Sequence, residues 1–260
     1  MTLNLNTITF IYAAFVLCIG ACLGSFLNAV IYRLPLNISI VTPRSFCPSC
    51  KKTIPWFSLT PIFGFFLTKG KCFFCKTKIS FQYPAVELFT ALGTVFLFCH
   101  ISKTFPLIVS LWLFYTGIVF SVIDFKHRIL PNAMTIPGMV VGFVLSCFNP
   151  DMGALASCMG IATGFLGLFC VSKLYELIRH RPGMGMGDVK YLGFIGAVLG
   201  WDGVLYTVML ASLAGSLFGI ALGLYHKRYL SLVIPFGPFL ALGACVVSIW
   251  KNDLMFFLLR

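Results

Sequence analysis

Four cysteines in the first third of the chain have the spacing of a metal site. They form two Cys-x-x-Cys pairs separated by 21 residues, Cys47-Pro-Ser-Cys50 and Cys72-Phe-Phe-Cys75. Two such turns supply the four thiolates that a structural zinc ion takes in tetrahedral geometry. Because protein would fill all four positions, this zinc would stabilise the fold and would not activate a water molecule. Disulfide bonds or a redox pair are the alternatives. A cytosolic location disfavours disulfide bonds. A redox pair is disfavoured because one Cys-x-x-Cys motif would be enough for it, and the chain has two.

The seven acidic residues are few enough to be sorted by their position in the chain. Four fall in polar connections, where we expect solvated side chains and, for the last of them, a surface ion pair: Asp151, Asp202, Asp253 and Glu176. The other three stand at the ends of long apolar stretches: Glu87, Asp124 and Asp188. An ionisable group beside hydrocarbon costs at least about 2.5–3.5 kcal/mol at mid-depth, so these three are the candidates for function.

Asp124 and Asp188 are the pair whose chemistry we consider first. Asp188 closes the run Gly183-Met184-Gly185-Met186-Gly187, whose glycines let the backbone approach a ligand or another segment closely. Two carboxylates in a low-dielectric recess share a proton, so that one serves as general base and the other as general acid. Such a pair activates water without a covalent intermediate. The helix dipole predicts that Asp188, at an N-terminus, is the ionised base and that Asp124, at a C-terminus, holds the proton.

Each of the three acids also has a structural interpretation. Asp188 could be a helix N-cap, and Glu87 could be a first-turn acid that complements the helix dipole. Asp124 could be a partner for Lys126 or Arg128. The sequence leaves these alternatives open, although a flexible glycine linker would have no need of an acid at a membrane edge.

The elements that must position these residues are apolar helices. Only 10% of the 260 residues are charged, 59% are hydrophobic and the mean hydropathy is +0.98, whereas soluble domains average about 25% charged residues. These values exclude aqueous enzyme folds, collagen-like chains and disordered chains. We expect an all-α polytopic membrane protein with eight transmembrane helices, at 8–28, 84–101, 106–124, 131–148, 153–172, 189–201, 203–225 and 234–250. The helix at 189–201 reaches only about 20 Å, which places Asp188 in a recess.

The charges predict the orientation of these helices. Lys and Arg number 19 against 7 Asp and Glu, a formal charge of +12. Alternate connections hold 16 and 3 of the basic residues, and the positive-inside rule places the 16 in the cytosol and both termini outside. Because the basic residues cluster between apolar stretches, membrane orientation explains them better than nucleic-acid binding.

Three parts follow from this distribution. Residues 1–32 form the first transmembrane helix, 33–83 a cytosolic zinc-binding module with eight Lys and Arg, and 84–260 a seven-helix membrane bundle. A segment as short as 33–83 has a small core, so we expect it to need the metal in order to fold.

Several short motifs are similar to those of the type IV prepilin leader peptidases with attached N-methyltransferase activity. They occur in order along the chain, and besides the two cysteine pairs they are Gly24-Ser25-Phe26-Leu27-Asn28 with Tyr32-Arg33-Leu34-Pro35, Ile79-Ser80 with Tyr83-Pro84 and Glu87-Leu88, Ile123-Asp124 with Leu130-Pro131, Gly185-Met186-Gly187-Asp188-Val189-Lys190, and Pro235-Phe236-Gly237-Pro238-Phe239. The chain departs from the family pattern at Asn132, where many relatives have an acid, and at Ser58-Leu59-Thr60-Pro61 after Trp56.

The resemblance implies that Asp124 and Asp188 are the catalytic dyad of a membrane aspartic endopeptidase of the GxGD type. Such enzymes cleave type IV prepilins and type II secretion pseudopilins after a glycine, at the junction of a basic leader and a hydrophobic helix. They then methylate the freed α-amino group with S-adenosylmethionine, at the cytosolic face of the bacterial inner membrane. Glu87 is our candidate for contacting the substrate amine or the sulfonium of the donor, which are both cationic.

Two alternative functions remain at this point. One is a peptidase without methyltransferase activity, and the other is a proton- or cation-coupled transporter that uses the three acids as a path. A zinc-bearing scaffold without activity is a further possibility. The expected partners are prepilins, pseudopilins and membrane lipids, and no nucleic acid. Since basic leaders and a basic cytosolic face repel each other, we expect the substrate to enter laterally, with anionic lipids screening the charge.

Overall fold

The computed structural model describes residues 5–149, 152–180, 184–226 and 234–258. Within these residues every regular element is a helix, and the only strand-like pairings are two isolated β-bridges. The expected all-α class is therefore confirmed. Some predictions concern residues that lie outside the described ranges, namely those for Asp151, Gly183, Arg181, Lys227, Arg228 and Arg260.

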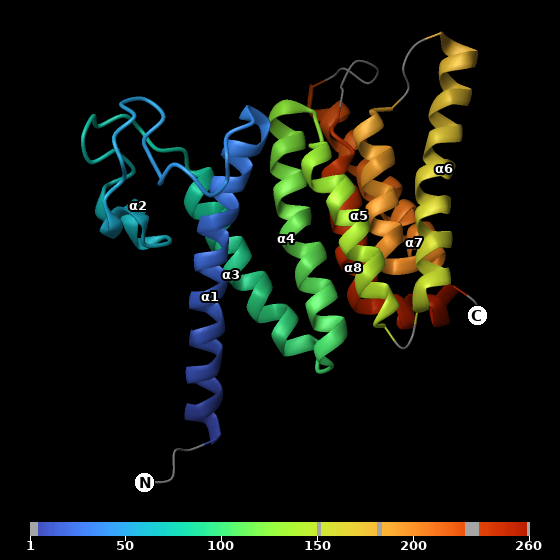
Figure 1. Cartoon of the computed structure of the whole chain (residues 1–260), viewed down its shortest axis with the longest axis horizontal. Helices are drawn as coiled ribbons and strands as arrows, with labels where there is room; N and C mark the ends of the chain where they lie inside the picture. The colour runs from blue at the N-terminus through green and yellow to red at the C-terminus, as the bar shows by residue number, and fades with distance from the viewer. Residues whose placement is uncertain (1–4, 150–151, 181–183, 227–233, 259–260) are drawn as a thin grey trace. The chain divides into compact units, whose positions relative to one another are not determined.

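The packing divides the chain into two units, Met1–Ser102 and Lys103–Arg260, and each is described by itself. The first unit contains α1 (Leu5–Arg33), η1 (Leu34–Leu36), η2 (Trp56–Leu59), α2 (Phe63–Leu67) and α3 (Gln82–His100) (Figure 1). The second unit contains α4 (Thr104–His127), α5 (Asn132–Cys147), α6 (Gly153–Arg179), α7 (Met186–His226) and α8 (Gly237–Leu258).

Five helices of the described chain are long and apolar enough to cross a membrane: α1, α3, α4, α6 and α7. Two more, α5 and the first part of α8, are apolar but shorter. Within α7, Gly200 has non-helical backbone angles, φ 79° and ψ 178°, so two helices join there. This break lies beside the boundary that the hydropathy places between 189–201 and 203–225.

The first unit is built on a close helix pair. A Cβ atom at Gly20 would lie 2.8 Å from the Cα of Ala91, and one at Gly24 would lie 2.7 Å from the Cα of Glu87. Only glycine therefore permits α1 and α3 to approach as they do, which is the use that membrane helices make of small residues. The segment between the two helices, residues 34–81, contains α2 and both cysteine pairs.

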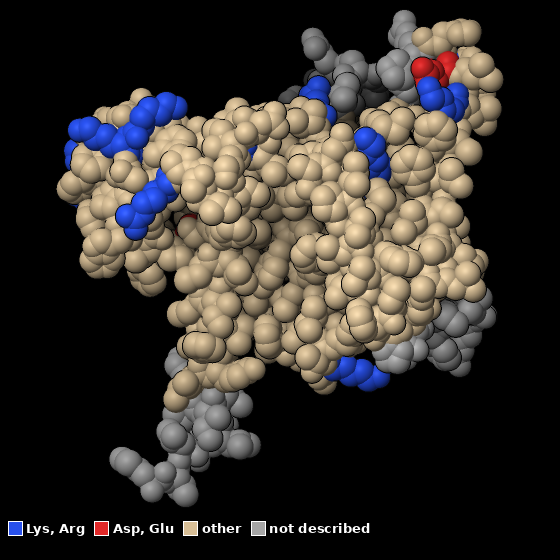
Figure 2. Space-filling view, in the orientation of Figure 1, with Lys and Arg blue, Asp and Glu red and all other residues tan. Residues whose placement is uncertain are grey.

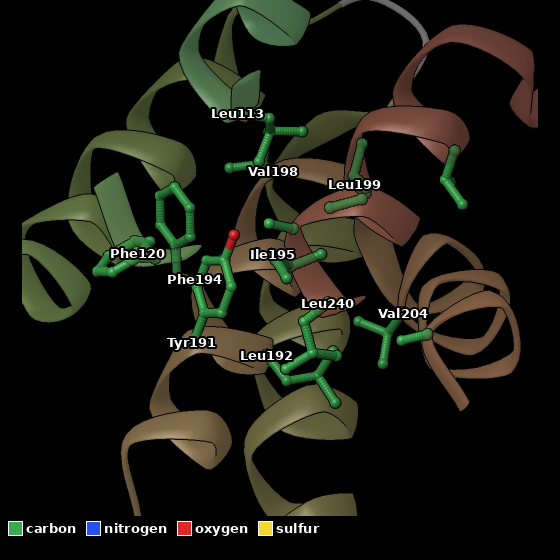
Figure 3. Packing of buried hydrophobic residues seen from close by; sticks show 14 of the residues in the cluster. Leu113, Phe120, Tyr191, Leu192, Phe194, Ile195, Val198, Leu199, Val204 and Leu240 are labelled. Atoms are coloured by element: carbon green, nitrogen blue, oxygen red, sulfur yellow. The ribbon is translucent and has the colours of Figure 1, made fainter. Parts of the chain in front are cut away.

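The second unit is packed around the first half of α7. Figure 3 shows Tyr191, Leu192, Phe194 and Ile195 of this helix surrounded by side chains from α4 and α8, among them Phe120 and Leu240. All six of these side chains are buried. The core of the unit therefore lies directly after the residue that the sequence selects for chemistry, Asp188.

Asp202 corrects one prediction. We expected a solvated connection residue, but its carboxylate forms an ion pair with Lys251 at 2.8 Å, and the two side chains are only about 30% exposed. Lys251 also donates to the carbonyl of Leu199, next to the break at Gly200. The pair stabilises the bend in α7, where the helix loses its own hydrogen bonds. Glu176 forms the expected exposed ion pair, with Lys173 at 2.8 Å.

Candidate functional site

The two aspartates lie at helix ends within the second unit. Asp124 is in the last turn of α4 and is buried, while Asp188 is in the first turn of α7 and is partly buried. They are close enough for the charge of Asp124 to act on Asp188. The structure thus brings together two carboxyl groups that are 64 residues apart in the sequence.

A third helix end holds Asp124 in place. The backbone N–H of Gly237, at the start of α8, donates to Oδ2 of Asp124 at 3.0 Å. A Cβ atom at Gly237 would lie 2.7 Å from that oxygen, so the contact requires glycine. Sequence reasoning missed this residue as a member of the site. The available signal was Gly237-Pro238, because proline is favoured in the first turn of a helix and the preceding N–H is left free.

These contacts oppose the prediction made from the helix dipole alone. Asp124 accepts an N–H from the N-terminus of α8 and interacts with the positive charge of Arg128, and both favour its anionic form. For Asp188 the structure gives the nearby charge of Asp124, which opposes ionisation of the second group. A direct hydrogen bond outweighs the dipole of the helix to which a residue belongs, so the geometry favours Asp124 as the charged member.

Glycines bring α7 close to its neighbours at the dyad. A Cβ atom at Gly187 would lie 2.9 Å from the Cβ of Leu130, and one at Gly185 would lie 3.4 Å from Oδ2 of Asp188. The expected close approach of the glycine run to another segment is therefore confirmed for Gly187. The segment that it meets is the Leu130-Pro131 connection between α4 and α5.

Aromatic rings pack one helical turn from the dyad. Phe120 precedes Asp124 by four residues, and Tyr191 follows Asp188 by three, so each ring lies on the same face as its aspartate. The two ring centroids are 4.5 Å apart, and Phe194 stacks on Tyr191 at 5.9 Å (Figure 3). This buried contact between α4 and α7 sets the distance between the two helices that carry the carboxyl groups.

A polar contact joins α5 and α7 near the same end. Nζ of Lys190 donates to Oδ1 of Asn132 at 2.8 Å. Asn132 is the position where many members of the resembled family have an acid, and this chain has a neutral amide there. The contact joins the start of α5 to the start of α7.

The four cysteines of the first unit form one cluster. Their sulfur atoms all lie within 4.8 Å of one another, and Sγ of Cys47 is 3.7 Å from Sγ of Cys75. A Zn–S bond of about 2.3 Å places the sulfurs of a tetrahedral site about 3.8 Å apart. The donor set and its spacing therefore fit zinc.

The two cysteine turns have the same backbone geometry. In each turn the residue after the second cysteine, Lys51 or Lys76, has a φ of 59°. The N–H of that lysine donates to the carbonyl of the first cysteine, at 2.9 Å for Cys47 and 3.0 Å for Cys72. Two equivalent turns that face each other are the arrangement of a zinc knuckle pair. The hydrogen bond with Thr77 lowers the pKa of the Cys75 thiol to about 6, which favours the thiolate that a metal needs.

Arg33 fastens the module to the end of α1. Its buried guanidinium donates to the carbonyls of Ser39, Ile40 and Pro43 at 3.1, 3.0 and 2.7 Å. From the sequence, Arg33 is one of the eight basic residues of the module and part of the motif Tyr32-Arg33-Leu34-Pro35. Its geometry shows that it closes the loop that leads into the first cysteine turn.

Glu87 lies in the first unit, on α3, and is buried. Its Oε2 accepts the N–H of Ile62 at 2.7 Å, and the Ser25 hydroxyl also hydrogen-bonds to it. Among the described residues no basic side chain forms a salt bridge with Glu87. Nearby on the same helix interface, Asn28 donates to the carbonyl of Tyr83 at 3.0 Å, and its buried Oδ1 has no hydrogen-bond partner within the described part of the chain. A buried carboxylate without a cation, next to an unpaired acceptor, suits a cationic ligand.

Comparison with protein families matches both units of the chain. Residues 18–101 match the bacterial peptidase A24 N-terminal domain, and residues 107–220 match the type IV leader peptidase family. The first match contains the cysteine cluster and Glu87, and the second contains both aspartates. No solved structure matches the chain.

Curated relatives extend the match over almost the whole chain. A protein of Pseudomonas aeruginosa is 31% identical over 93% of this chain and 92% of its own length, and one of Xanthomonas campestris is 34% identical over 91% of each. A protein of Myxococcus xanthus is 36% identical over 84% of this chain and 65% of its own length. All three are named prepilin leader peptidase/N-methyltransferase.

Proposed function

The chain belongs to the type IV leader peptidase family, and we propose that it removes the basic leader of type IV prepilins and pseudopilins after a glycine by aspartic catalysis. The observation that carries this proposal is the pairing of Asp124 with Asp188 at the ends of α4 and α7. Two interacting carboxyl groups at neighbouring helix ends have the composition that activates water for peptide hydrolysis.

In the resting pair, Asp124 is the base and Asp188 carries the proton. Asp124 takes a proton from the water while the water oxygen bonds to the scissile carbonyl carbon. Asp188 gives its proton to the carbonyl oxygen. The C–N bond of the resulting gem-diol breaks as Asp124 returns its proton to the leaving nitrogen. Asp188 takes a proton from a gem-diol hydroxyl, which restores the starting state of the pair. The N–H of Gly237 keeps Asp124 oriented throughout.

For the second activity we propose Glu87 as the residue that faces a cation. S-adenosylmethionine supplies a methyl group from its sulfonium when it is bound. Glu87 is buried and forms no ion pair among the described residues, so its carboxylate can hold either that sulfonium or the freed α-amine of the substrate. Its hydrogen bond from Ile62 also ties the loop between the cysteine turns to α3.

We infer that the membrane topology has eight spans. The five long helices, the two shorter ones and the division of α7 at Gly200 supply that number. The basic connections then lie in the cytosol and both termini outside, as the positive-inside rule requires. The zinc-bearing module would stand at the cytosolic face of the bacterial inner membrane.

A cleavage assay with purified protein in detergent tests the proposal. We expect the chain to cleave a prepilin, and Asp124→Asn and Asp188→Asn each to lose cleavage, while Asp253→Asn, an exposed acid on α8, leaves it unchanged. Cleavage that persists in either dyad variant would contradict the assignment. Adding S-adenosylmethionine labelled in its methyl group then reports methylation of the new N-terminus, and cleavage without label transfer would leave a peptidase only.

The transporter alternative is not favoured. It needs acids along a path at mid-depth, whereas Asp124 and Asp188 stand at helix ends and the curated relatives carry the names of enzymes. The scaffold alternative gives no reason for the contacts of Gly187 and Gly237 at the two aspartates.

A further inference from the structure

The segment between α1 and α3 has an exposed apolar surface that the peptidase mechanism does not use. Trp56 of η2 is 80% exposed, and Phe63, Phe66 and Leu67 of α2 are 73, 64 and 70% exposed. We call these four residues the foot. The sequence of α2 is Phe-Gly-Phe-Phe-Leu, without a single charged or polar side chain. An exposed helix of this composition is unstable in water and indicates a contact with something apolar.

Two contacts give the depth of the foot along the membrane-spanning helices. Ile62, directly before α2, donates its N–H to Glu87, which lies five residues inside α3 and therefore about 7 Å from the start of that helix. The same carboxylate hydrogen-bonds to Ser25, eight residues or about 12 Å before the end of α1. Figure 1 shows α2 level with the C-terminal half of α1 and not beyond its end. The turn directly before the foot therefore lies beside residues that fall inside the spans predicted from hydropathy for both flanking helices.

The chain reaches this depth against its ordinary backbone preference. Ile62 has a φ of 62° and a ψ of −57°, a conformation that costs a β-branched residue free energy. The hydrogen bond to Glu87 and the packing of α2 on η2, where Gly64 touches the carbonyl of Ser58, hold it there. A strained turn that aims an all-apolar helix along the spans is consistent with a function at that level.

The same segment also carries many positive charges. Seven exposed basic side chains surround the cysteine turns, and residues 1–86 contain no acid: Arg44, Lys51, Lys52, Lys69, Lys71, Lys76 and Lys78. Figure 2 shows blue side chains over the upper and middle part of this segment and a tan surface below them. We call these seven residues the basic rim. Four thiolates on one zinc ion leave a charge of about −2, which does not cancel the rim.

We propose that the module is a membrane-surface element whose foot inserts into the adjacent leaflet and whose basic rim binds anionic phospholipid headgroups. Interfacial helices bury their apolar faces about 5–10 Å into the boundary between headgroups and acyl chains, and Ile62, directly before α2, is hydrogen-bonded about 7 Å from the start of α3. Tryptophan and lysine at that boundary follow the ordinary preference of interfacial residues. The module is thus held at its two ends by α1 and α3 and along its underside by lipid.

Depth-dependent quenching tests the foot without any substrate. The full chain with Trp56→Phe and Phe66→Trp is placed in nanodiscs whose lipid acyl chains are brominated near the headgroup, and the spectrum of the Trp56→Phe chain is subtracted. We expect blue-shifted emission from position 66 that brominated lipid quenches. The matched control is Val41→Trp in the same background, because Val41 is 86% exposed and lies beside Ile40, whose carbonyl Arg33 binds at the end of α1. Its emission should stay red and unquenched.

The outcomes separate lipid from other occupants. Red, unquenched emission from position 66 would overturn the proposal. So would emission that shifts only when a prepilin is added, because the foot would then be a surface for the substrate. The conservative exchange of one aromatic ring for another keeps the protein folded in this test.

A second measurement tests the basic rim. Spin-labelled phosphatidylglycerol and phosphatidylcholine report the lipids that the protein immobilises. We expect the wild-type chain to select phosphatidylglycerol, and the combined variant Lys69→Gln, Lys71→Gln, Lys76→Gln and Lys78→Gln to lose most of that selectivity. The control variant Lys173→Gln and Arg179→Gln, on α6 of the other unit, should keep it. Equal selectivity in the rim variant and the wild type would overturn the role of the rim.

Discussion

The two units of the molecule hold their functional groups by opposite means. In the second unit the aspartates are fixed by buried packing and by backbone contacts, with Phe120 against Tyr191 and the N–H of Gly237 on Asp124. In the first unit the module between α1 and α3 buries few of its own apolar side chains and has four clustered cysteine sulfurs that could hold a metal. A reaction that needs two carboxyl groups in one geometry uses a rigid core. A surface module needs only a metal site and its connections to α1 and α3.

Zinc removal should give the largest difference between the units. Structural zinc contributes about 10–16 kcal/mol of apparent binding free energy at pH 7, which is also folding free energy. Chelation, or Cys72→Ser, should therefore unfold residues 34–81 and leave the second unit intact. Hydrogen exchange followed by mass spectrometry measures both units in one experiment. Equal loss of protection in α4 and α7 would show that the units do not differ as proposed.

The pH at which zinc leaves sharpens the same comparison. Hydrogen bonds with Thr77 lower the pKa of the Cys75 thiol to about 6, so the thiolate that binds a metal forms at a lower pH than in a free cysteine. Thr77→Val removes the hydroxyl and should move zinc release to a higher pH, with zinc measured by a colorimetric chelator. An unchanged release profile would mean that the hydroxyl does not act on the thiol. Thr53→Val, three residues after the other cysteine pair, serves as the control.

Gly237→Ala should impair catalysis in the second unit with little change in folding. The added Cβ would stand 2.7 Å from Oδ2 of Asp124, so the carboxylate must move. A displacement of about 1 Å in a catalytic group costs about 100-fold in rate. We expect kcat to fall by about that factor while KM changes little. Gly167→Ala, where an added Cβ meets nothing within 4 Å, is the matched control and should cleave normally.

Changes at Tyr191 should have a smaller effect and should separate packing from hydrogen bonding. Its buried hydroxyl has no hydrogen-bond partner among the described residues, so Tyr191→Phe should retain cleavage and stability. Tyr191→Leu removes the ring that meets Phe120 and should lower kcat by about tenfold and shift the pH profile of cleavage, since the spacing of the pair changes. A normal pH profile in the leucine variant would contradict the positioning role.

The smallest effect is expected at the bend in α7. Lys251→Met breaks the half-buried ion pair with Asp202 and should lower the free energy of unfolding by about 1 kcal/mol. Cleavage should stay normal, because the pair lies at Gly200 and not at the dyad. Thermal unfolding in detergent measures the change. If Lys251→Met lost cleavage while it unfolded at the wild-type temperature, the bend would influence the two aspartates.

The sequence predicts the features that depend on local spacing. Four cysteines in two pairs, an all-helical membrane architecture and acids at the ends of apolar stretches can all be identified from composition and pattern. The contacts that tune the site cannot be identified in this way, because they join distant segments. Gly237 and Asp124 are 113 residues apart, and the guanidinium of Arg33 closes a loop by binding carbonyl groups that carry no sequence signal.

Which aspartate is charged also depends on a contact between distant segments, and the sequence alone does not predict it. A helix dipole can be inferred from the predicted ends of α4 and α7, and it favours Asp188 as the anion. The N-terminus of α8 reverses this preference, and its position next to Asp124 emerges only from the fold. Carboxyl stretching bands of Asp124→Asn and Asp188→Asn distinguish the two assignments. With Asp124 as the anion, the protonated band should survive in Asp124→Asn and vanish in Asp188→Asn.

The central claim is that Asp124 and Asp188 act as one catalytic unit. Single-turnover cleavage of a prepilin by Asp124→Asn, Asp188→Asn and the double variant tests it most directly, with folding of each checked by thermal unfolding. When two residues act as one catalytic unit, removing either one abolishes the contribution of both. The double variant should therefore cleave no more slowly than the slower single variant. If the losses of the two single variants multiply in the double variant, or if either single variant cleaves at the wild-type rate, the two aspartates do not form a dyad.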